Sequence, residues 1–271
     1  MIYKINRWIA LTIFSLLILI PCTMVFFGSF KSDLEIYDSP MALPLEWTLG
    51  NYRRLLDDGA ILTNFKNSVI VTSFSVLITL ILASMVSFAI ARLMNVTGKV
   101  LFVLFALGLA IPGQVNIIPI YILFNDLNLT NTYHGLIAVN VVATLPISVF
   151  ILSSFFREIS KEMYEVASID GASHFRVFRS IALPLSRPAL GATSIFLFVI
   201  CWNDLLFPLL LITESAKKTL PLALLDYRGE YATSFSMIFT AVMVASVPMV
   251  IMYLAMQKTF VAGLTAGAVK G

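Results

Sequence analysis

Charged side chains are scarce in this sequence: Asp, Glu, Lys and Arg make up 12% of its 271 residues, while hydrophobic residues make up 59%. A soluble domain carries about 25% charged residues, so the composition excludes an ordinary soluble protein and indicates an integral membrane protein. The formal net charge of +3 comes without a basic patch interleaved with aromatic residues, so nucleic-acid binding is not indicated.

The sequence also lacks the usual signatures of catalysis. It contains no G-x-x-x-x-G-K-[ST] phosphate loop, and no His, Cys and carboxylate constellation suggests a catalytic or metal site. The two cysteines, Cys22 and Cys201, fall inside apolar runs, where small buried residues are expected rather than a disulfide. We therefore expect a chain that is not an enzyme and holds no cofactor; ATP-driven work would need hydrolysis on another polypeptide.

The sequence contains six long apolar runs with few or no charged residues. Each is long enough for the roughly 20 residues that a helix needs to cross a bilayer. The first is expected to remain as a span, because its apolar core is longer than that of a signal peptide. We predict an all-α integral membrane protein with one transmembrane domain over 1–271. The six spans are expected at about 8–30, 67–91, 100–125, 133–156, 188–213 and 231–257.

The distribution of Lys and Arg predicts the orientation. With a cytoplasmic N-terminus, the cytoplasmic side would hold 11 of the 18 basic residues and the other side 7, while most acidic residues would lie outside. Cytoplasmic loops carry the excess of Lys and Arg. The sequence therefore predicts that both termini, the loop 157–187 and the tail 258–271 are cytoplasmic.

The loop 157–187 is the one large charged loop on the predicted cytoplasmic side. Ser160 can cap a first helix, and Gly171 can end or bend it, because glycine accepts the left-handed conformation at little cost. Ser173 can then cap a second helix. In the first helix, Met163, Val166 and Ala167 are expected to lie on an apolar side. Taken alone, the pattern fits a plain solvated helix-turn-helix as well as a docking loop.

This loop resembles the cytoplasmic EAA loop of ABC-importer permeases, whose pattern is E-A-A, a glycine four residues later, and then I-x-L-P. The sequence has Glu165-Val166-Ala167, Gly171 and Ile181-Ala182-Leu183-Pro184, with Val166 in place of the middle alanine. The tail 257–271 resembles that of maltose-type permeases for carbohydrate uptake. Further matches to the family are Trp202-Asn203-Asp204 and Asn51-Tyr52 with Asn67-Ser68.

The resemblance implies a type I ABC importer permease fold in a bacterial or archaeal cytoplasmic (inner) membrane. The implied partners are a second, homologous permease, two ATPase subunits that bind ATP and Mg²⁺, an extracytoplasmic solute-binding protein and a sugar substrate. It also implies a set of residues that contact the ATPase subunits. These are Glu165, Ala167, Ser168, Asp170, Gly171, Ala172, Ser173, His174, Phe175, Arg176, Gly263 and Gly267.

Polar residues inside the apolar runs are candidates for the translocation path, because polar groups at membrane depth must find partners or line a cavity. The candidates are Gln114, Asn116, Asn140, Thr144, Trp202, Asn203 and Asp204. Hydrogen bonding between helices is the alternative. Asp204, the one acid inside a predicted span, can be a structural hydrogen bonder or line the cavity.

Three other functions stay open on the sequence. An ion-coupled secondary transporter would need charge pairs inside the membrane, and Asp204 has no basic partner in the spans. A scaffold or receptor subunit would use the loop only to hold a cytoplasmic partner. Glycerol phosphate or a polyol, instead of a sugar, could be imported by the same ABC mechanism.

Overall fold

The computed structural model describes residues 2–93, 95–227 and 233–268, without the side chains of residues 2, 3, 5, 168 and 258–268. Every secondary-structure element in these ranges is a helix, which confirms the predicted all-α class. The chain divides into two compact units: residues 1–66 with 219–248, and residues 67–218 with 249–271. Helices α4 and α14 each contribute residues to both units.

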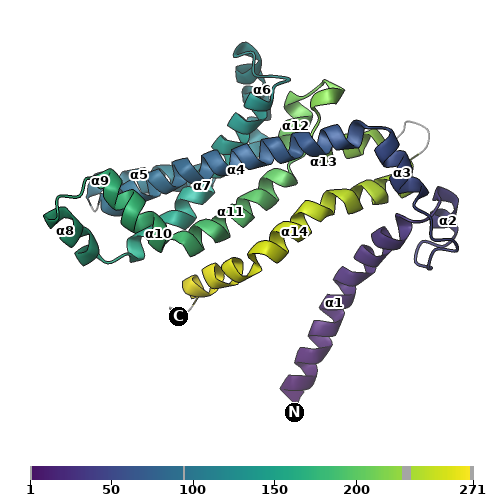
Figure 1. Cartoon of the computed structure of the whole chain (residues 1–271), viewed down its shortest axis with the longest axis horizontal. Helices are drawn as coiled ribbons and strands as arrows, with labels where there is room; N and C mark the ends of the chain where they lie inside the picture. Colours follow the sequence, from purple (N-terminus) through teal and green to yellow (C-terminus); the bar gives the residue numbers. More distant parts are fainter. Residues whose placement is uncertain (1, 94, 228–232, 269–271) are drawn as a thin grey trace. The chain divides into compact units, whose positions relative to one another are not determined.

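The first unit contains a long N-terminal helix, short helices after it, and the ends of two long helices (Figure 1). Its elements are α1 (Ile2–Gly28), α2 (Asp33–Asp38), α3 (Gly50–Asp57), the first turns of α4 (Ala60–Arg92), α13 (Leu220–Ala223), η4 (Leu224–Tyr227) and the first part of α14 (Phe235–Ala268).

Polar side chains hold the connection after α1 in place. The Asn51 side-chain amide donates to the carbonyl oxygens of Ser29 and Lys31, at 3.0 and 2.8 Å. Asp33 Oδ1 accepts from the backbone N–H of Ser236 at 2.8 Å, which ties this connection to the start of α14. Buried backbone carbonyls need such partners, so Asn51 of the family-like Asn51-Tyr52 pair has a structural role here.

The second unit is built around α7, which packs against α5, α11 and α12 and hydrogen-bonds to α4. Helix α7 spans Tyr133–Glu158. Besides most of α4 and the last part of α14, the other elements are α5 (Val96–Gly108), η1 (Gly113–Asn116), α6 (Ile117–Asp126), α8 (Lys161–Ile169), α9 (His174–Val177), the π-turn η2 (Phe178–Ala182), α10 (Leu183–Leu185), α11 (Arg187–Trp202), α12 (Leu206–Leu211) and η3 (Ser215–Lys217).

Among the described residues, four helices are long and apolar enough to cross a membrane, or up to six if each of two bent pairs counts as one span. One bent pair lies within the third predicted run, where α5 and the η1–α6 segment meet at 80°. Pro112 lies at this break and cannot donate a backbone hydrogen bond. In the other pair, the segment 174–185 meets α11 at 76°. The run predicted at 188–213 is itself interrupted between α11 and α12.

Two asparagines fasten one end of the second unit. The Asn67 side-chain amide donates to the carbonyl oxygens of Ala216 and Lys218, both at 2.9 Å. Its Oδ1 accepts from the Tyr133 hydroxyl at 2.7 Å. One amide therefore joins the start of α4 to the start of α7 and to the loop after α12.

Asn131 makes the matching contact from the loop before α7. Its Oδ1 accepts from the backbone N–H groups of Thr213 and Glu214, at 2.7 and 3.0 Å. Its φ of 55° is in the left-handed region, which asparagine tolerates better than most residues. We call Asn67 and Asn131, with the 211–218 segment they hold, the asparagine clasp.

Candidate functional site

The segment between α7 and α11 contains two short helices joined by a tight turn at Gly171. The backbone N–H of Asp170 donates to the carbonyl of Val166 at 3.0 Å, and that of Ala172 donates to the carbonyl of Ala167 at 2.9 Å. Gly171 has a φ of +73°, which confirms the predicted left-handed turn. A Cβ added at Gly171 would meet no atom within 4 Å, so backbone conformation alone favours glycine here.

Ser173 begins the second helix as predicted: its Oγ accepts from the backbone N–H of Arg176 at 3.3 Å. Helix α9 then passes through the π-turn η2 into α10. Pro184 follows the π-turn and has no backbone N–H to donate, which interrupts the regular helical hydrogen bonding at this point. The chain therefore leaves the loop through a continuous but irregular helical path.

Aromatic packing fastens this loop to the long helices. The Phe88 ring lies 6.2 Å from the ring of Phe156, 6.1 Å from that of Tyr164 and 5.2 Å from that of Phe178, measured between centroids. All four side chains are buried, and they come from α4, α7, α8 and η2. Aromatic pairs add about 0.5–1.5 kcal/mol each beyond the burial of their area. We call these four residues the Phe88 cluster.

Arg92, the last residue of α4, lies against the same cluster. Its guanidinium carbon is 4.4 Å from the centre of the Tyr164 ring, a cation–π distance. Burial raises the pKa of Tyr164, and the charge of Arg92 opposes part of this shift. The phenol therefore stays neutral at physiological pH and acts as a packing surface.

The outward side of the loop is apolar. The exposed fractions are 85% for Ile169, 64% for Phe175 and 58% for Val166, whereas Ala167 is buried. Of the three residues predicted on an apolar side, Val166 and Met163 are exposed and Ala167 is buried. Helix α8 is apolar on two sides: one packs on the Phe88 cluster and the other is free to contact a partner. Large exposed apolar groups in a charged loop mark an interaction surface.

Most of the residues predicted to contact ATPase subunits lie on the surface of this loop. The exposed members are Glu165, Asp170, Gly171, Ser173, His174, Phe175 and Arg176. Ala172 is half-buried, and Ala167 packs inside the chain in the same core as the Phe88 cluster. The Ser168 side chain and the tail beyond residue 257, with Gly263 and Gly267, lie outside the side chains that the structure describes.

Two of the predicted path residues are buried between helices of the second unit. Asn140 and Thr144 are each 3% exposed. The hydroxyls of Thr144 and Thr79 share a hydrogen bond of 3.1 Å between α7 and α4, and Thr144 donates to the carbonyl of Asn140 at 2.7 Å. For Thr144 the structure therefore favours hydrogen bonding between helices over a place on the path.

The Trp202-Asn203-Asp204 motif lies at the interruption between α11 and α12. Trp202 is buried and stacks on Phe198, with ring centroids 5.5 Å apart. The Asn203 amide donates to the carbonyl of Val199 at 2.8 Å. Trp202 and Asn203 thus both contact the last turns of α11.

Asp204 Oδ1 accepts from the backbone N–H groups of Leu206 and Phe207, at 3.1 and 3.3 Å. It therefore caps α12, as expected of a structural hydrogen bonder. Its Oδ2 is buried and has no hydrogen-bond partner among the described residues.

The other broken helix lies beside this one. Helix α12 contacts α6, and the Phe207 ring approaches the position that a Cβ at Gly113 would occupy, at 3.9 Å. Gln114 and Asn116 lie in η1, directly after Gly113; Gln114 is exposed and Asn116 half-buried. The two interrupted apolar helices thus meet close to their breaks, at Gly113 and Phe207.

A model of the family described as "Binding-protein-dependent transport system inner membrane component" matches residues 76–264. The chain belongs to this family. It is 38% identical over 273 residues to a putative ABC transporter permease protein, ORF2, of Caldicellulosiruptor sp. (strain Rt8B.4), covering 100% of this chain and 99% of the relative. It is 34% identical over 276 residues to the trehalose/maltose transport system permease protein MalG of Thermococcus litoralis, covering 99% of each.

The fold of this permease is that of a solved importer. A crystal structure of a bacterial ABC transporter involved in the import of the acidic polysaccharide alginate contains a chain that superposes with a TM-score of 0.84. The match covers 96% of both chains at 22% sequence identity, which shows the type I importer permease fold. The exposed loop with its buried aromatic base is therefore part of an ABC importer permease.

Several residues that build the permease's loop were not among the predicted site residues. Ile169 and Val166 carry much of the exposed apolar surface, and Phe88 and Arg92 hold the loop from α4. The spacing of Val166 and Ile169, three residues apart, could have indicated a second apolar side of α8. No local signal links Phe88 to the loop, because the contact joins segments far apart in the sequence.

Proposed function

We propose that this chain is one of two permease subunits in an ATP-driven importer, and that its α8–α9 loop docks onto an ATPase subunit. The observation that supports docking is the combination of a buried aromatic base with an exposed apolar surface at Val166, Ile169 and Phe175. A loop with both features can bind a partner and pass its movement to α4 and α7. ATP and Mg²⁺ would be bound by the partner subunits.

The proposed orientation places this loop and both termini in the cytoplasm, in keeping with the excess of Lys and Arg on that side. On the other side, a solute-binding protein would deliver the solute to a cavity between the two permeases. The interruptions after α5 and α11, with Gln114, Asn116, Asn203 and Asp204, are proposed to face that cavity. Polar groups at broken helices form the substrate sites of many transporters.

The proposed substrate is a sugar or oligosaccharide. The support is the MalG relative of Thermococcus litoralis, which is named for trehalose and maltose and aligns along nearly the whole chain. Neutral hydroxyl-rich solutes suit a path lined by amides and a carboxylate, because amides donate and accept hydrogen bonds and a carboxylate accepts them from hydroxyl groups. Maltose and trehalose are therefore the first substrates to test.

The experiment is uptake of labelled maltose and trehalose into vesicles that contain the permease with its co-purifying subunits, the binding protein outside and ATP trapped inside. We expect uptake that depends on internal ATP and on the binding protein. Uptake driven by an ion gradient without ATP would overturn the proposal in favour of a secondary transporter. Binding of the partner without any uptake of solute would favour a scaffold.

One variant tests the docking surface directly. Ile169→Ser removes an exposed apolar group and leaves the fold intact, so the ATPase subunit should be lost from the purified complex while the permease remains in the membrane. The control is Leu45→Ser, at a residue that is 87% exposed but lies far from this loop in the sequence. Equal ATPase retention in both variants would show that Ile169 is not part of the docking surface.

A further inference from the structure

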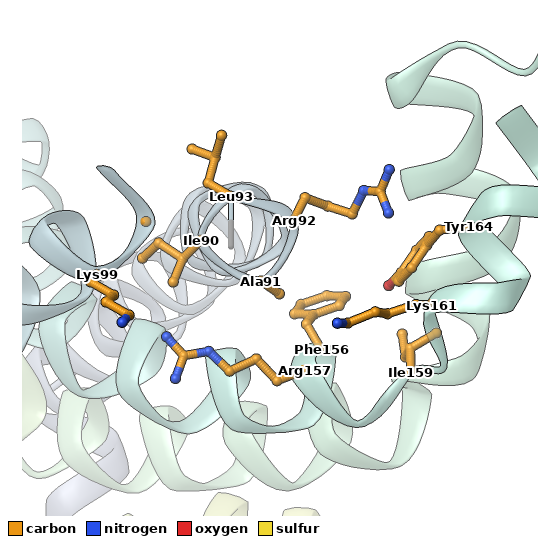
Figure 2. A pocket seen from close by; sticks show the side chains of 11 residues that line it. Ile90, Ala91, Arg92, Leu93, Lys99, Phe156, Arg157, Ile159, Lys161 and Tyr164 are labelled. Atoms are coloured by element: carbon orange, nitrogen blue, oxygen red, sulfur yellow. The ribbon is translucent and has the colours of Figure 1, made fainter. Parts of the chain in front are cut away.

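A cavity of about 300 Å³ opens where α4, α5, α7 and α8 come together (Figure 2). Each of these helices contributes one cationic side chain to its lining: Arg92, Lys99, Arg157 and Lys161. Neither Asp nor Glu lines this cavity. The remaining lining is mostly apolar, so the cavity is a basic pocket with a hydrophobic wall.

The cationic groups are not neutralised within the described part of the chain. Figure 2 shows the heads of Lys99 and Arg157 pointing toward one another, while the Lys161 ammonium lies apart from them, beside the Phe156 ring. None of these groups forms an ion pair with a carboxylate of the described residues. The pKa of the Glu162 carboxyl is lowered mainly by hydrogen bonds to its own backbone N–H and to the Ser160 side chain. The charge of Lys161 lowers this pKa less. Like charges held close together are unfavourable until an anion enters.

Ring contacts hold two of the cations in place. The Arg157 guanidinium carbon is 4.5 Å from the centre of the Phe102 ring, and Arg92 lies on Tyr164 in the same manner. An oriented guanidinium can bind a phosphate with two parallel hydrogen bonds, while a lysine adds a compact positive charge. The chemistry of this pocket therefore matches a phosphate group.

The surroundings of the pocket favour a lipid as the source of that phosphate. Helix α5, which carries Lys99, has an exposed apolar face at helical spacing. The face comprises Val96, Val100, Val103 and Leu107. The pocket thus lies where an apolar, lipid-facing helix surface ends, which is the level of phospholipid headgroups. Basic pockets between helices at this level bind anionic headgroups.

We propose that this cavity binds the phosphate group of an anionic phospholipid headgroup. The site needs neither sugar nor ATPase, so it goes beyond the proposed function; only its assignment to the inner leaflet rests on the proposed orientation. A bound headgroup would join the ends of α4, α5 and α7 to the start of α8. The anionic lipid content of the membrane would then regulate how firmly the docking loop is held.

The test measures binding of a photoreactive phosphatidylglycerol to the full-length permease, with its co-purifying subunits, in phosphatidylcholine nanodiscs. Crosslinks should map to peptides that contain residues 92–99 and 157–161. Lys99→Gln with Arg157→Gln should weaken binding about 30-fold, because each basic residue near a membrane surface contributes roughly a factor of five. The matched control, Arg179→Gln with Arg187→Gln, removes two exposed cations outside the lining and should change binding less than threefold.

Two further arms identify the ligand. A photoreactive phosphatidylcholine should crosslink these peptides far less than phosphatidylglycerol, and millimolar inorganic phosphate should not displace the anionic lipid. Equal labelling by both lipids, unchanged binding in the double variant, or displacement by free phosphate would overturn the proposal. If the double variant is not recovered folded, the single variant Lys161→Gln, at an exposed helix start, should still weaken binding about fivefold; no change would likewise overturn the site.

Discussion

The asparagine clasp and the Phe88 cluster fasten opposite ends of α4 by different forces. At the clasp, Asn67 binds backbone carbonyls through hydrogen bonds of 2.9 Å, which are directional and weaken when their angle changes. At the cluster, Phe88 holds the loop by aromatic packing, which is far less directional. We infer that the clasp fixes its loop in one position, whereas the cluster lets the docking loop tilt as a body while it stays attached.

The largest effect is expected from Phe88→Ala, which removes the centre of the aromatic cluster. Large-to-small changes at buried aromatic residues cost about 3–5 kcal/mol. The variant should insert into the membrane but expose the α8–α9 loop to protease and lose ATPase subunits. Phe150→Ala is the control, because Phe150 also stacks on a ring but is 46% exposed. If both variants behave alike, aromatic packing does not hold the loop.

Asn67→Ala should have the next largest effect, and at the opposite end. It leaves the carbonyls of Ala216 and Lys218 without this donor, at a cost of about 1–3 kcal/mol. The thermal midpoint should fall and protease should cut the 213–218 loop, while ATPase retention should be unchanged. Asn67→Asp, which keeps the acceptor for Tyr133 but loses the donors, should resemble Asn67→Ala. Loss of ATPase subunits from either variant would contradict the separation of the two ends.

Gly171→Val is expected to have a smaller effect on stability but a large one on coupling. Valine at a φ of +73° costs about 1–2 kcal/mol, although no atom blocks the side chain. The variant should stay in the membrane with its partner permease and lose most sugar uptake. Gly171→Asn is the matched control, since asparagine accepts this conformation, and it should keep more uptake.

Glu165→Lys belongs to the same experiment, because it reverses an exposed charge at the proposed contact. It should lower uptake without changing the thermal midpoint. Subunit composition, binding-protein-stimulated hydrolysis and uptake are measured side by side for all three variants. Normal uptake in both Gly171→Val and Glu165→Lys would mean that this loop is only a connector.

The smallest effect is expected from Asp204→Asn, which lies outside both attachments. Asparagine caps helices about as well as aspartate, so the bonds to Leu206 and Phe207 can persist and stability should change by less than about 1 kcal/mol. ATP-driven uptake should remain substantial. Collapse of uptake in this variant, together with proton-driven transport in the wild type, would instead assign Asp204 to proton coupling.

Local features of the loop could be predicted from the sequence, whereas contacts over long distances could not. Gly171 and Ser173 have roles that short-range backbone chemistry dictates, and both were predicted. Val166 was predicted on an apolar side of α8, but periodicity alone did not say whether that side is buried or exposed. The bonds of Asn67 join residues about 150 positions apart along the chain, so no local pattern reveals them.

The residues predicted to line the translocation path show the same limit of sequence analysis. Thr144 and Asp204 are both polar residues within apolar runs, yet one joins α7 to α4 and the other caps α12. Polarity at membrane depth demands a partner but does not say whether that partner is a helix, a backbone amide or a solute. Only the three-dimensional arrangement separates these cases.

The spacing of the two attachments on α4 has a consequence for the lipid environment. Asn67 and Phe88 are 21 residues apart in one helix, which corresponds to about 32 Å along its axis at 1.5 Å per residue. That length is close to the hydrocarbon thickness of an ordinary bilayer, about 30 Å, and no charged residue lies between the two positions. Because both ends are attached to other parts of the chain, the apolar length of α4 between them is fixed. Transport should therefore be fastest at one acyl-chain length and fall in thinner or thicker membranes through hydrophobic mismatch.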